Sequence, residues 1–182
     1  TLRPQVGNPR PRIHRVPSAQ ALINSLGFPN QGMDSLLTRV TPHASSFTRL
    51  GINLGKGKDT PLAQAAADYC ALLRRVHAPA DYVTINVSSP NTPGLRQLQT
   101  RAALEELLQA VVSARNRLTP RVPLLVKIAP DLSESEMDDV LAAIQANGVD
   151  GIIATNTTVA RAGVPPSAAA RPGGLSGAPL RA

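Results

Sequence analysis

Short runs of β-branched and other apolar residues alternate with longer, helix-like segments from about residue 45 onward. This alternation is typical of βα units, in which helices join parallel strands. We expect four strands, at residues 48–54, 82–87, 123–128 and 151–155. Their period of roughly 30 to 40 residues fits either a doubly wound sheet or a (β/α)8 barrel, two α/β architectures. A closed barrel needs about 250 residues and eight strands, so four strands would form about half of one.

Three helices are predicted between these strands, at residues 61–76, 101–118 and 134–147. In each of them, apolar residues recur at helical spacing and would form a buried stripe. The first helix should follow Thr60 as its N-cap, with Pro61 at the first helical position. The third has a capping box made by Ser133 and Glu136, and Gly148 follows its last turn.

The two ends of the chain are less regular. Before residue 45 we expect a loop rich in Pro and Arg, a short helix at residues 18–26 and a turn at residues 27–32. After Thr158 the sequence predicts a loop that runs to the glycines at positions 173, 174 and 177. The chain begins without Met and stops just after these glycines, so we expect a fragment that is poorly stable alone.

The composition supports a globular domain and excludes several kinds of site. Of the 182 residues, 42% are hydrophobic and 17% are charged, which suits a chain with an apolar core. Only 2% are aromatic, which argues strongly against a platform that stacks nucleic-acid bases. The single cysteine, Cys70, rules out an internal disulfide and a four-thiolate zinc site, and the three histidines lack metal-ligand spacing. No apolar run is long enough to span a bilayer.

Positive charge is concentrated near the amino terminus. The first 60 residues hold eight Lys and Arg against two Asp and Glu, whereas the other 122 hold eleven against ten. Such a basic stretch could contact nucleic acid, an anionic lipid surface, or an anionic ligand such as a phosphate or carboxylate. The composition does not choose among these partners.

Polar side chains stand at the carboxyl end of every predicted strand. They are Asn53, Asn86, Lys127, and Asn156 with its neighbours Thr155 and Thr157. In α/β folds ligands bind at this edge of the sheet, so the repetition predicts a site assembled from successive strands. Lys127 lies in an otherwise apolar strand, which favours an anionic partner or a cofactor that becomes anionic on reduction. The alternative is that its side chain extends from the strand end to solvent.

The loop that follows the second strand, NVSSPNTPG at residues 86–94, is stiffened by two prolines and is rich in amides and hydroxyls. An amide offers both a donor and an acceptor, which matches the edges of a pyrimidine-like ligand. No nearby Asp or His completes a triad with Ser89, which argues against a serine hydrolase. The GKGK run at residues 55–58 lacks phosphate-loop spacing, so no nucleoside triphosphate site is predicted.

Six strings along the chain resemble the dihydroorotate dehydrogenase family, in particular its membrane-associated, quinone-linked class. They are GNPRPR, GINLGKGKDTP, DYVTINVSSPNTPGLR, LLVKIAPDL, DGIIATNTT and GGLSGAPLR. The most specific is NVSSPNT, because its second Ser, here Ser89, is the catalytic base in that class, whereas the soluble classes carry Cys there. The resemblance implies a (β/α)8 barrel, of which this chain would be about the central half, within one FMN-binding domain that spans residues 1–182.

The resemblance also implies a set of ligand contacts. FMN would contact Asn53, Asn86, Lys127, Thr155 and Gly177. Dihydroorotate would be held by Asn24, Asn86, Asn91, Asn156 and Thr157. Ser89 would take the C5 proton, hydride would pass from C6 to the flavin, and a quinone would reoxidise the flavin, yielding orotate for UMP synthesis. A lone Ser is a weak base, so a relay through Thr92 or water is expected to accept the proton.

Membrane association is expected to be peripheral, at a bacterial or mitochondrial inner membrane, through a segment absent from this otherwise soluble chain. Arg15, in the basic loop, is expected near the path of the quinone; a solvated basic loop is the alternative. The chain departs from the family pattern at His14, Pro29 and Gly57, which concerns loop shape. The alternatives are a non-catalytic fragment, a related FMN barrel reductase, and a Rossmann-type reductase, for which no GxGxxG follows a strand.

Overall fold

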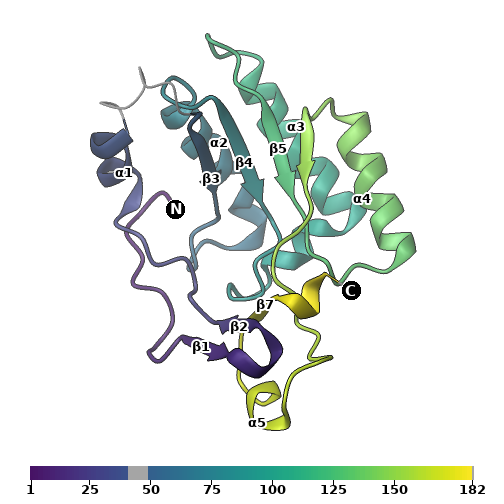
Figure 1. Cartoon of the computed structure of the whole chain (residues 1–182). Helices are drawn as coiled ribbons and strands as arrows, with labels where there is room; N and C mark the ends of the chain where they lie inside the picture. Colours follow the sequence, from purple (N-terminus) through teal and green to yellow (C-terminus); the bar gives the residue numbers. More distant parts are fainter. Residues whose placement is uncertain (41–48, 182) are drawn as a thin grey trace.

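Four parallel strands form the larger sheet in the order of the sequence. They are β3 (Gly51–Leu54), β4 (Tyr82–Asn86), β5 (Leu124–Lys127) and β6 (Gly151–Ile153). The computed structural model describes residues 1–40 and 49–181 (Figure 1). All four predicted strands are confirmed, except that position 48, at the start of the first, lies outside the described residues.

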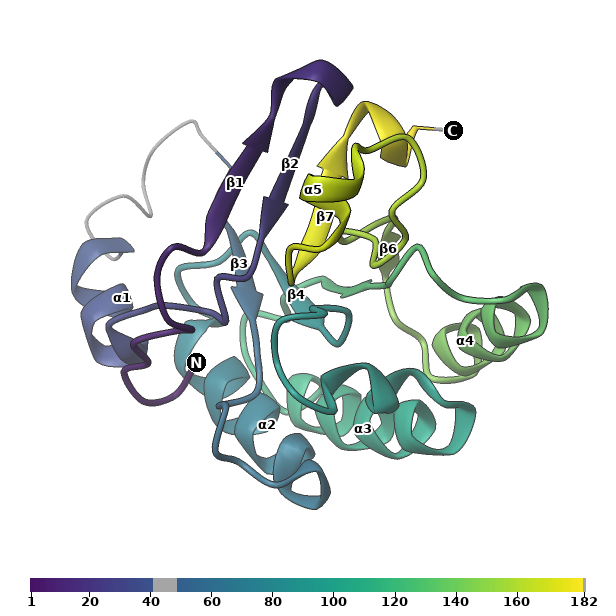
Figure 2. The same cartoon turned by 90° about the horizontal axis from the view of Figure 1, so that it is seen from below.

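Helices follow the strands and cover one face of this sheet (Figures 1 and 2). They are α2 (Ala65–Val76), α3 (Arg101–Arg115) and α4 (Glu134–Ala146). A doubly wound sheet carries helices on both faces and reverses its strand order, whereas a barrel keeps the sequence order and places its helices outside. The arrangement is therefore that of successive βα units of a barrel.

The helix-covered face is apolar because alternate residues of each strand point to it. Ile52, Ile85 and Val126 are buried there with neighbouring apolar residues of the same strands. They pack against the buried stripes of the helices, which include Leu73 in α2 and Leu108 in α3. Burial of one such side chain contributes about 1.5–3 kcal/mol, so this layer holds the helices on the sheet.

A second, antiparallel sheet lies beyond the carboxyl ends of the parallel strands (Figure 1). It consists of β1 (Ile13–Val16), β2 (Ala21–Asn24) and β7 (Gly174–Gly177), with β2 in the middle. Its small core is made by Val16, Ile23 and Leu175. The short helix predicted at residues 18–26 is therefore wrong, because β2 pairs with a strand on each side. These pairings outweigh the helical spacing of its apolar residues.

Two further expectations are corrected near the chain ends. The predicted loop after Thr158 contains α5 (Pro166–Ala169) and β7. The region before residue 45 contains α1 (Gly32–Val40), which the sequence analysis did not predict. Met33 of α1 is buried in the main core, so tertiary packing stabilises this short helix.

Helix boundaries agree with the sequence in one case and differ in two. The capping box of α4 is confirmed, since Ser133 Oγ accepts from Glu136 N (3.3 Å) and Glu136 Oε2 accepts from Ser133 N (2.8 Å). Thr60 is not the N-cap of α2, because a 3₁₀ turn precedes the helix and the Thr60 hydroxyl donates to Asp68 (2.7 Å). The second helix ends at Arg115 rather than at residue 118. Within the described residues, no helix is long and apolar enough to cross a membrane.

Candidate active site

The face of the parallel sheet opposite the helices carries three of the predicted site residues. Asn86 of β4 pairs with Lys127 of β5, and Asn53 of β3 pairs with Thr84. Paired residues in neighbouring strands, and residues two apart along one strand, point to the same face of a sheet. Asn53, Asn86 and Lys127 therefore project from one face at the carboxyl edge, as the sequence predicted.

Lys127 is half-buried on this face. Its ammonium makes no hydrogen bond or ion pair within residues 1–40 and 49–181. A partly desolvated cation without an anion is costly, so this position favours a ligand that carries or acquires negative charge.

Buried Asn86 and Ser88 and half-buried Asn156 form a cluster of side-chain hydrogen bonds. Asn86 Oδ1 accepts from the backbone N–H of Ser88 (3.2 Å) and from the Ser88 hydroxyl (3.1 Å). Asn156 Nδ2 donates to Ser88 Oγ (3.1 Å) and to Asn86 Oδ1 (3.4 Å). The loop after β4 is thereby joined to the loop after β6, and the hydroxyl proton of Ser88 is committed to Asn86.

Ser89 has a different environment from its neighbour. Its Oγ accepts from the backbone N–H of Asn91 (3.2 Å), and its own proton has no acceptor within the described part of the chain. Asn91 Nδ2 in turn donates to the backbone oxygen and to Oδ1 of Asn24, both at 3.0 Å. The structure thus brings Ser89, Asn91 and Asn24 together, although they come from segments 67 residues apart.

Thr92 Oγ1 is buried and has no hydrogen-bond partner among the described residues. No hydrogen bond joins it to Ser89 in that part of the chain, so a relay between the two would need a water molecule. An unpaired buried hydroxyl is costly, which indicates that a further polar group belongs beside it.

The remaining predicted residues lie on the loop after β6 and on β7. Thr155 Oγ1 donates to the backbone oxygen of Asn156 (3.0 Å), and Thr157 N donates to Asn156 Oδ1 (2.8 Å). Thr157 lies against Gly174, where a Cβ would come within 1.9 Å of Thr157 Oγ1. Gly177 is three residues further along β7, beside Ala21. The polar cluster therefore includes Thr155 and Thr157 but not Gly177.

The backbone conformation and the close packing at Gly177 favour glycine there, independently of any ligand. Its φ is +105°, and a Cβ there would lie 2.3 Å from the backbone oxygen of Gln20. The close approach of the β1–β2 hairpin thus requires glycine at this position. Its predicted contact with FMN stays a prediction.

A buried lysine and a buried tyrosine support the site from the helix side. Lys56 donates to the backbone oxygens of Gly57 (2.8 Å) and Thr60, and desolvation lowers the pKa of its ammonium, although Asp68 opposes this. The GKGK run is therefore a folded turn with its first lysine enclosed. Tyr69 Oη donates to the backbone oxygen of Asn86 (2.7 Å), and burial raises the pKa of Tyr69. Sequence reasoning assigned Tyr69 only to the core.

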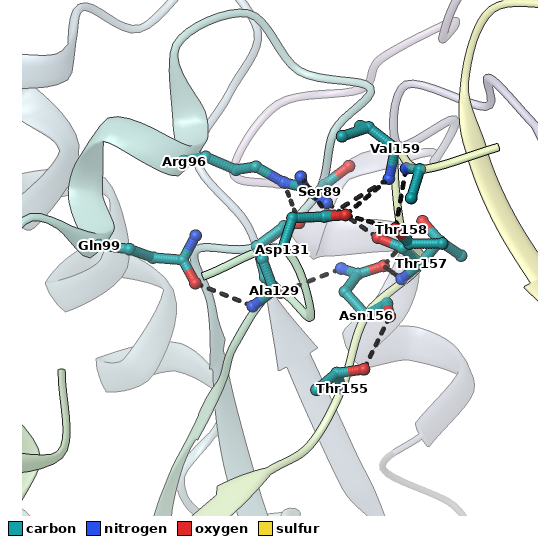
Figure 3. A network of polar contacts seen from close by, with 12 residues as sticks. Ser89, Arg96, Gln99, Ala129, Asp131, Thr155, Asn156, Thr157, Thr158 and Val159 are labelled. Atoms are coloured by element: carbon teal, nitrogen blue, oxygen red, sulfur yellow. Dashed lines mark hydrogen bonds and ion pairs between the residues drawn. The ribbon is translucent and has the colours of Figure 1, made fainter. Parts of the chain in front are cut away.

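Sequence reasoning also missed Arg96 and Asp131, which form an ion pair of 2.8 Å beside the polar cluster (Figure 3). Burial alone would raise the pKa of Asp131. Hydrogen bonds from the Thr158 hydroxyl, Arg96 and the Val159 N–H outweigh it and hold the pKa below its usual range. The available signal was weak: an arginine and an aspartate in the loops after two neighbouring strands.

Two cavities lie on different sides of the parallel sheet, and the smaller one is next to its carboxyl edge. The larger, of about 490 Å³, lies between α2 and α3 with Ala66 and Leu107 in its lining, so it is on the helix side of the sheet. The smaller, of about 130 Å³, is lined by Asn53 together with Phe28 and Gly55. The side-chain chemistry therefore places the candidate site at the polar edge near the smaller cavity, not in the larger one.

The strand order, the helices on one face and the polar carboxyl edge are those of about half of a (β/α)8-barrel protein. The chain matches the family model for dihydroorotate dehydrogenase over residues 1–182. The chain therefore belongs to the dihydroorotate dehydrogenase family.

Individual relatives agree with this. Proteins named dihydroorotate dehydrogenase (quinone) from Anaeromyxobacter sp. (strain K) and Pseudomonas fluorescens are each 52% identical, over 99% and 100% of this chain and 50% and 55% of their own lengths. The crystal structure of ligand-free DHODH from Eimeria tenella matches 99% of this chain and 56% of its own, with 38% identity and a TM-score of 0.91. The chain thus spans about half the length of these relatives. The names of the first two support the resemblance to the quinone-linked class.

Proposed function

We propose that this chain supplies the catalytic base and most of the substrate-binding amides of an FMN-dependent dihydroorotate dehydrogenase, within one barrel domain that includes residues 1–182. The proposed reaction converts dihydroorotate to orotate for UMP synthesis, with a quinone as electron acceptor. The observation that carries the proposal is the environment of Ser89. Its hydroxyl proton has no acceptor among residues 1–40 and 49–181, and hydrogen bonds join its loop to Asn24 and Asn156.

The residues present fit a flavin at the open face of the sheet. Lys127 lacks an anionic partner within the described residues, and Asn53 is exposed on the same face, on β3, with β4 between them. The flavin would be held by Asn53, Asn86, Lys127, Thr155 and Gly177, and when bound it would supply the acceptor for the C6 hydride. Lys127 would favour the reduced form, because its positive charge offsets the negative charge of a reduced ring.

The substrate would be held by amide and hydroxyl groups from three loops. Its ring amides match the donor and acceptor pairs of Asn24, Asn86, Asn91, Asn156 and Thr157. Ser89 Oγ would take the proton from C5, and its own proton would pass to a water beside Thr92, whose buried hydroxyl has no partner in the described part of the chain. The hydrogen bond from Asn91 N fixes the direction of the Ser89 oxygen.

The test uses a full-length dehydrogenase that carries this segment, for example the Pseudomonas fluorescens relative with its matching half replaced by this chain. The purified protein should be yellow, lose its flavin absorbance when dihydroorotate is added without oxygen, and regain it with a quinone. A flavin that dihydroorotate does not reduce would contradict the proposal and favour a non-catalytic barrel. Reoxidation by fumarate or a nicotinamide cofactor, but not by quinone, would overturn the acceptor. Sedimentation with membranes would test the proposed peripheral association.

Arg15→Ala is predicted to weaken quinone turnover about tenfold and to spare flavin reduction by dihydroorotate. Arg15 is exposed on β1, and its guanidinium makes no hydrogen bond or ion pair within the described residues. Arg12, by contrast, is committed to the backbone oxygens of Val6 and Asn8. Stopped-flow measurement of each half-reaction separates the effects, with exposed Arg117→Ala as the charge-matched control. Equal losses in both half-reactions would refute a role in the quinone path.

A further inference from the structure

One guanidinium joins three loops that leave the carboxyl ends of neighbouring strands (Figure 3). Arg96 lies in the 3₁₀ helix Leu95–Gln99 that follows the β4 loop. Its Nε donates to the backbone oxygen of Ser88 (2.9 Å), and its Nη2 donates to the backbone oxygen of Thr157 (2.8 Å). Its Nη1 pairs with Asp131 Oδ2 (2.8 Å), on the loop after β5. The loops after β4, β5 and β6 therefore meet at a single side chain.

Asp131 extends this connection into the loop after β6. Its Oδ1 accepts from the hydroxyl of Thr158 and from the backbone N–H of Val159 (3.1 Å). The side chains of Arg96 and Asp131 are 23% and 20% exposed, whereas those of the surface pair Arg101 and Asp139 are 57% and 48% exposed. Because a shielded, multiply hydrogen-bonded pair is less weakened by solvent than a surface pair, Arg96 holds the three loops in a fixed geometry.

We propose that Arg96 is a positioning residue that sets the separation between Ser89 and the Asn156–Thr157 pair. The inference rests on the proposed function, in which Ser89 takes a proton from a substrate held by Asn156 and Thr157. Arg96 binds the peptide oxygen that immediately precedes Ser89 and the peptide oxygen of Thr157 itself. A displacement of about 1 Å between reacting groups costs on the order of 10²-fold in rate, so this spacing bears directly on the reaction.

The shape of the side chain makes arginine specific here. A guanidinium is a planar fork with donors in fixed directions, and Arg96 uses its three nitrogens on three different loops. A lysine ammonium keeps the charge that pairs with Asp131 but cannot reproduce this geometry. The substitution Arg96→Lys therefore tests the geometry of this side chain separately from its charge.

The test is made in the full-length dehydrogenase that carries this segment. Arg96→Ala should slow flavin reduction at saturating dihydroorotate about 100-fold, and Arg96→Lys about tenfold. Free guanidinium ion at millimolar concentration should restore at least tenfold to Arg96→Ala, because it can occupy the space between the three loops. The apparent pKa of the pH–rate profile should not move, since the base is unchanged. Arg101→Ala, which removes an exposed arginine that pairs with Glu105 and Asp139, should react within twofold of the unsubstituted protein.

Each outcome decides the inference. If Arg96→Ala does not fold, Arg96→Lys decides it: a tenfold slower reduction at unchanged melting temperature supports positioning, and an unchanged rate overturns it. Guanidinium that restores the melting temperature but not the rate also overturns it.

If the unsubstituted protein is not reduced by dihydroorotate, the proposed function fails. Amide exchange then decides whether Arg96 positions these loops: faster exchange in Arg96→Lys confined to residues 87–92 and 155–159 supports it, and unchanged exchange overturns it.

Discussion

Ser89→Ala should slow the reduction of flavin by dihydroorotate by on the order of 10² or more and leave FMN bound. The change removes a hydroxyl of the NVSSPNT loop whose oxygen accepts from the backbone N–H of Asn91 and whose proton has no acceptor within the described residues. Flavin content is read from absorbance, and the rate from stopped-flow reduction without oxygen. An unchanged rate would remove Ser89 from the mechanism.

The neighbouring serine supplies the sharpest comparison. Ser88→Ala should cost about tenfold, because its hydroxyl donates to Asn86 and accepts from Asn156, so its loss displaces ligand-binding groups without removing the base. Ser135→Ala, on the exposed first turn of α4, should leave the rate unchanged. If Ser88→Ala lost more activity than Ser89→Ala, the base would have to be reassigned.

Arg115→Ala should lower the free energy of unfolding by about 3 kcal/mol, because it removes one partner of an enclosed ion pair. The side chain is 3% exposed, pairs with Asp150 and also donates to the backbone oxygen of Gly148 (3.3 Å). Asp150 Oδ2 accepts from the backbone N–H of Leu124 as well (2.8 Å), so the pair joins α3 to the starts of β5 and β6. Urea denaturation of the full-length protein that carries this segment measures the loss.

Arg121→Ala is the matched control. Arg121 binds the other oxygen of Asp150 (2.8 Å), but its side chain is 54% exposed. Solvent screening limits such a pair to about 1 kcal/mol or less. Equal losses for Arg121→Ala and Arg115→Ala would show that enclosure does not set the strength of this pair.

At acid pH, the difference in the free energy of unfolding between Arg115→Ala and the unsubstituted protein should become smaller. Burial alone would raise the pKa of Asp150, but the Leu124 N–H, Arg121 and the charge of Arg115 hold it below its ordinary value. A carboxyl whose pKa is depressed by folding stabilises the folded state above its unfolded pKa of about 3.9, and this contribution disappears as the pH falls through the folded pKa. The cost of Arg115→Ala should therefore be smaller at pH 3 than at pH 7, and a pH-independent cost would contradict this.

The parts of the structure that the sequence predicted are those encoded by local periodicity. The four parallel strands and the capping box of α4 depend on residues within a few positions of each other. Asn53, Asn86 and Lys127 could be placed at one edge because parallel strands repeat the same direction. Local spacing gave the wrong prediction for β2. Its apolar residues have helical spacing, but pairing with β1 on one side and β7 on the other makes it a strand.

The missed part of the site depends on contacts with the backbone. Arg96 binds peptide oxygens of Ser88 and Thr157, and the latter is 61 positions away. Every residue type carries such an oxygen, so no side-chain pattern identifies the partner. Side-chain chemistry at strand ends was thus visible in the sequence, whereas the geometry that aligns the loops was not.

The pairing of β2 with β7 joins two segments that lie far apart in the sequence. Ser176 Oγ donates to the backbone oxygen of Leu22 (3.3 Å) across 154 positions, whereas β3 to β6 pair in sequence order. Contacts of long sequence separation carry a larger loop-closure entropy and form late. During synthesis, β2 cannot pair with β7 until β7 has left the ribosome. We therefore expect the antiparallel sheet, in which Asn24 ends β2, to be completed after the parallel sheet of β3 to β6.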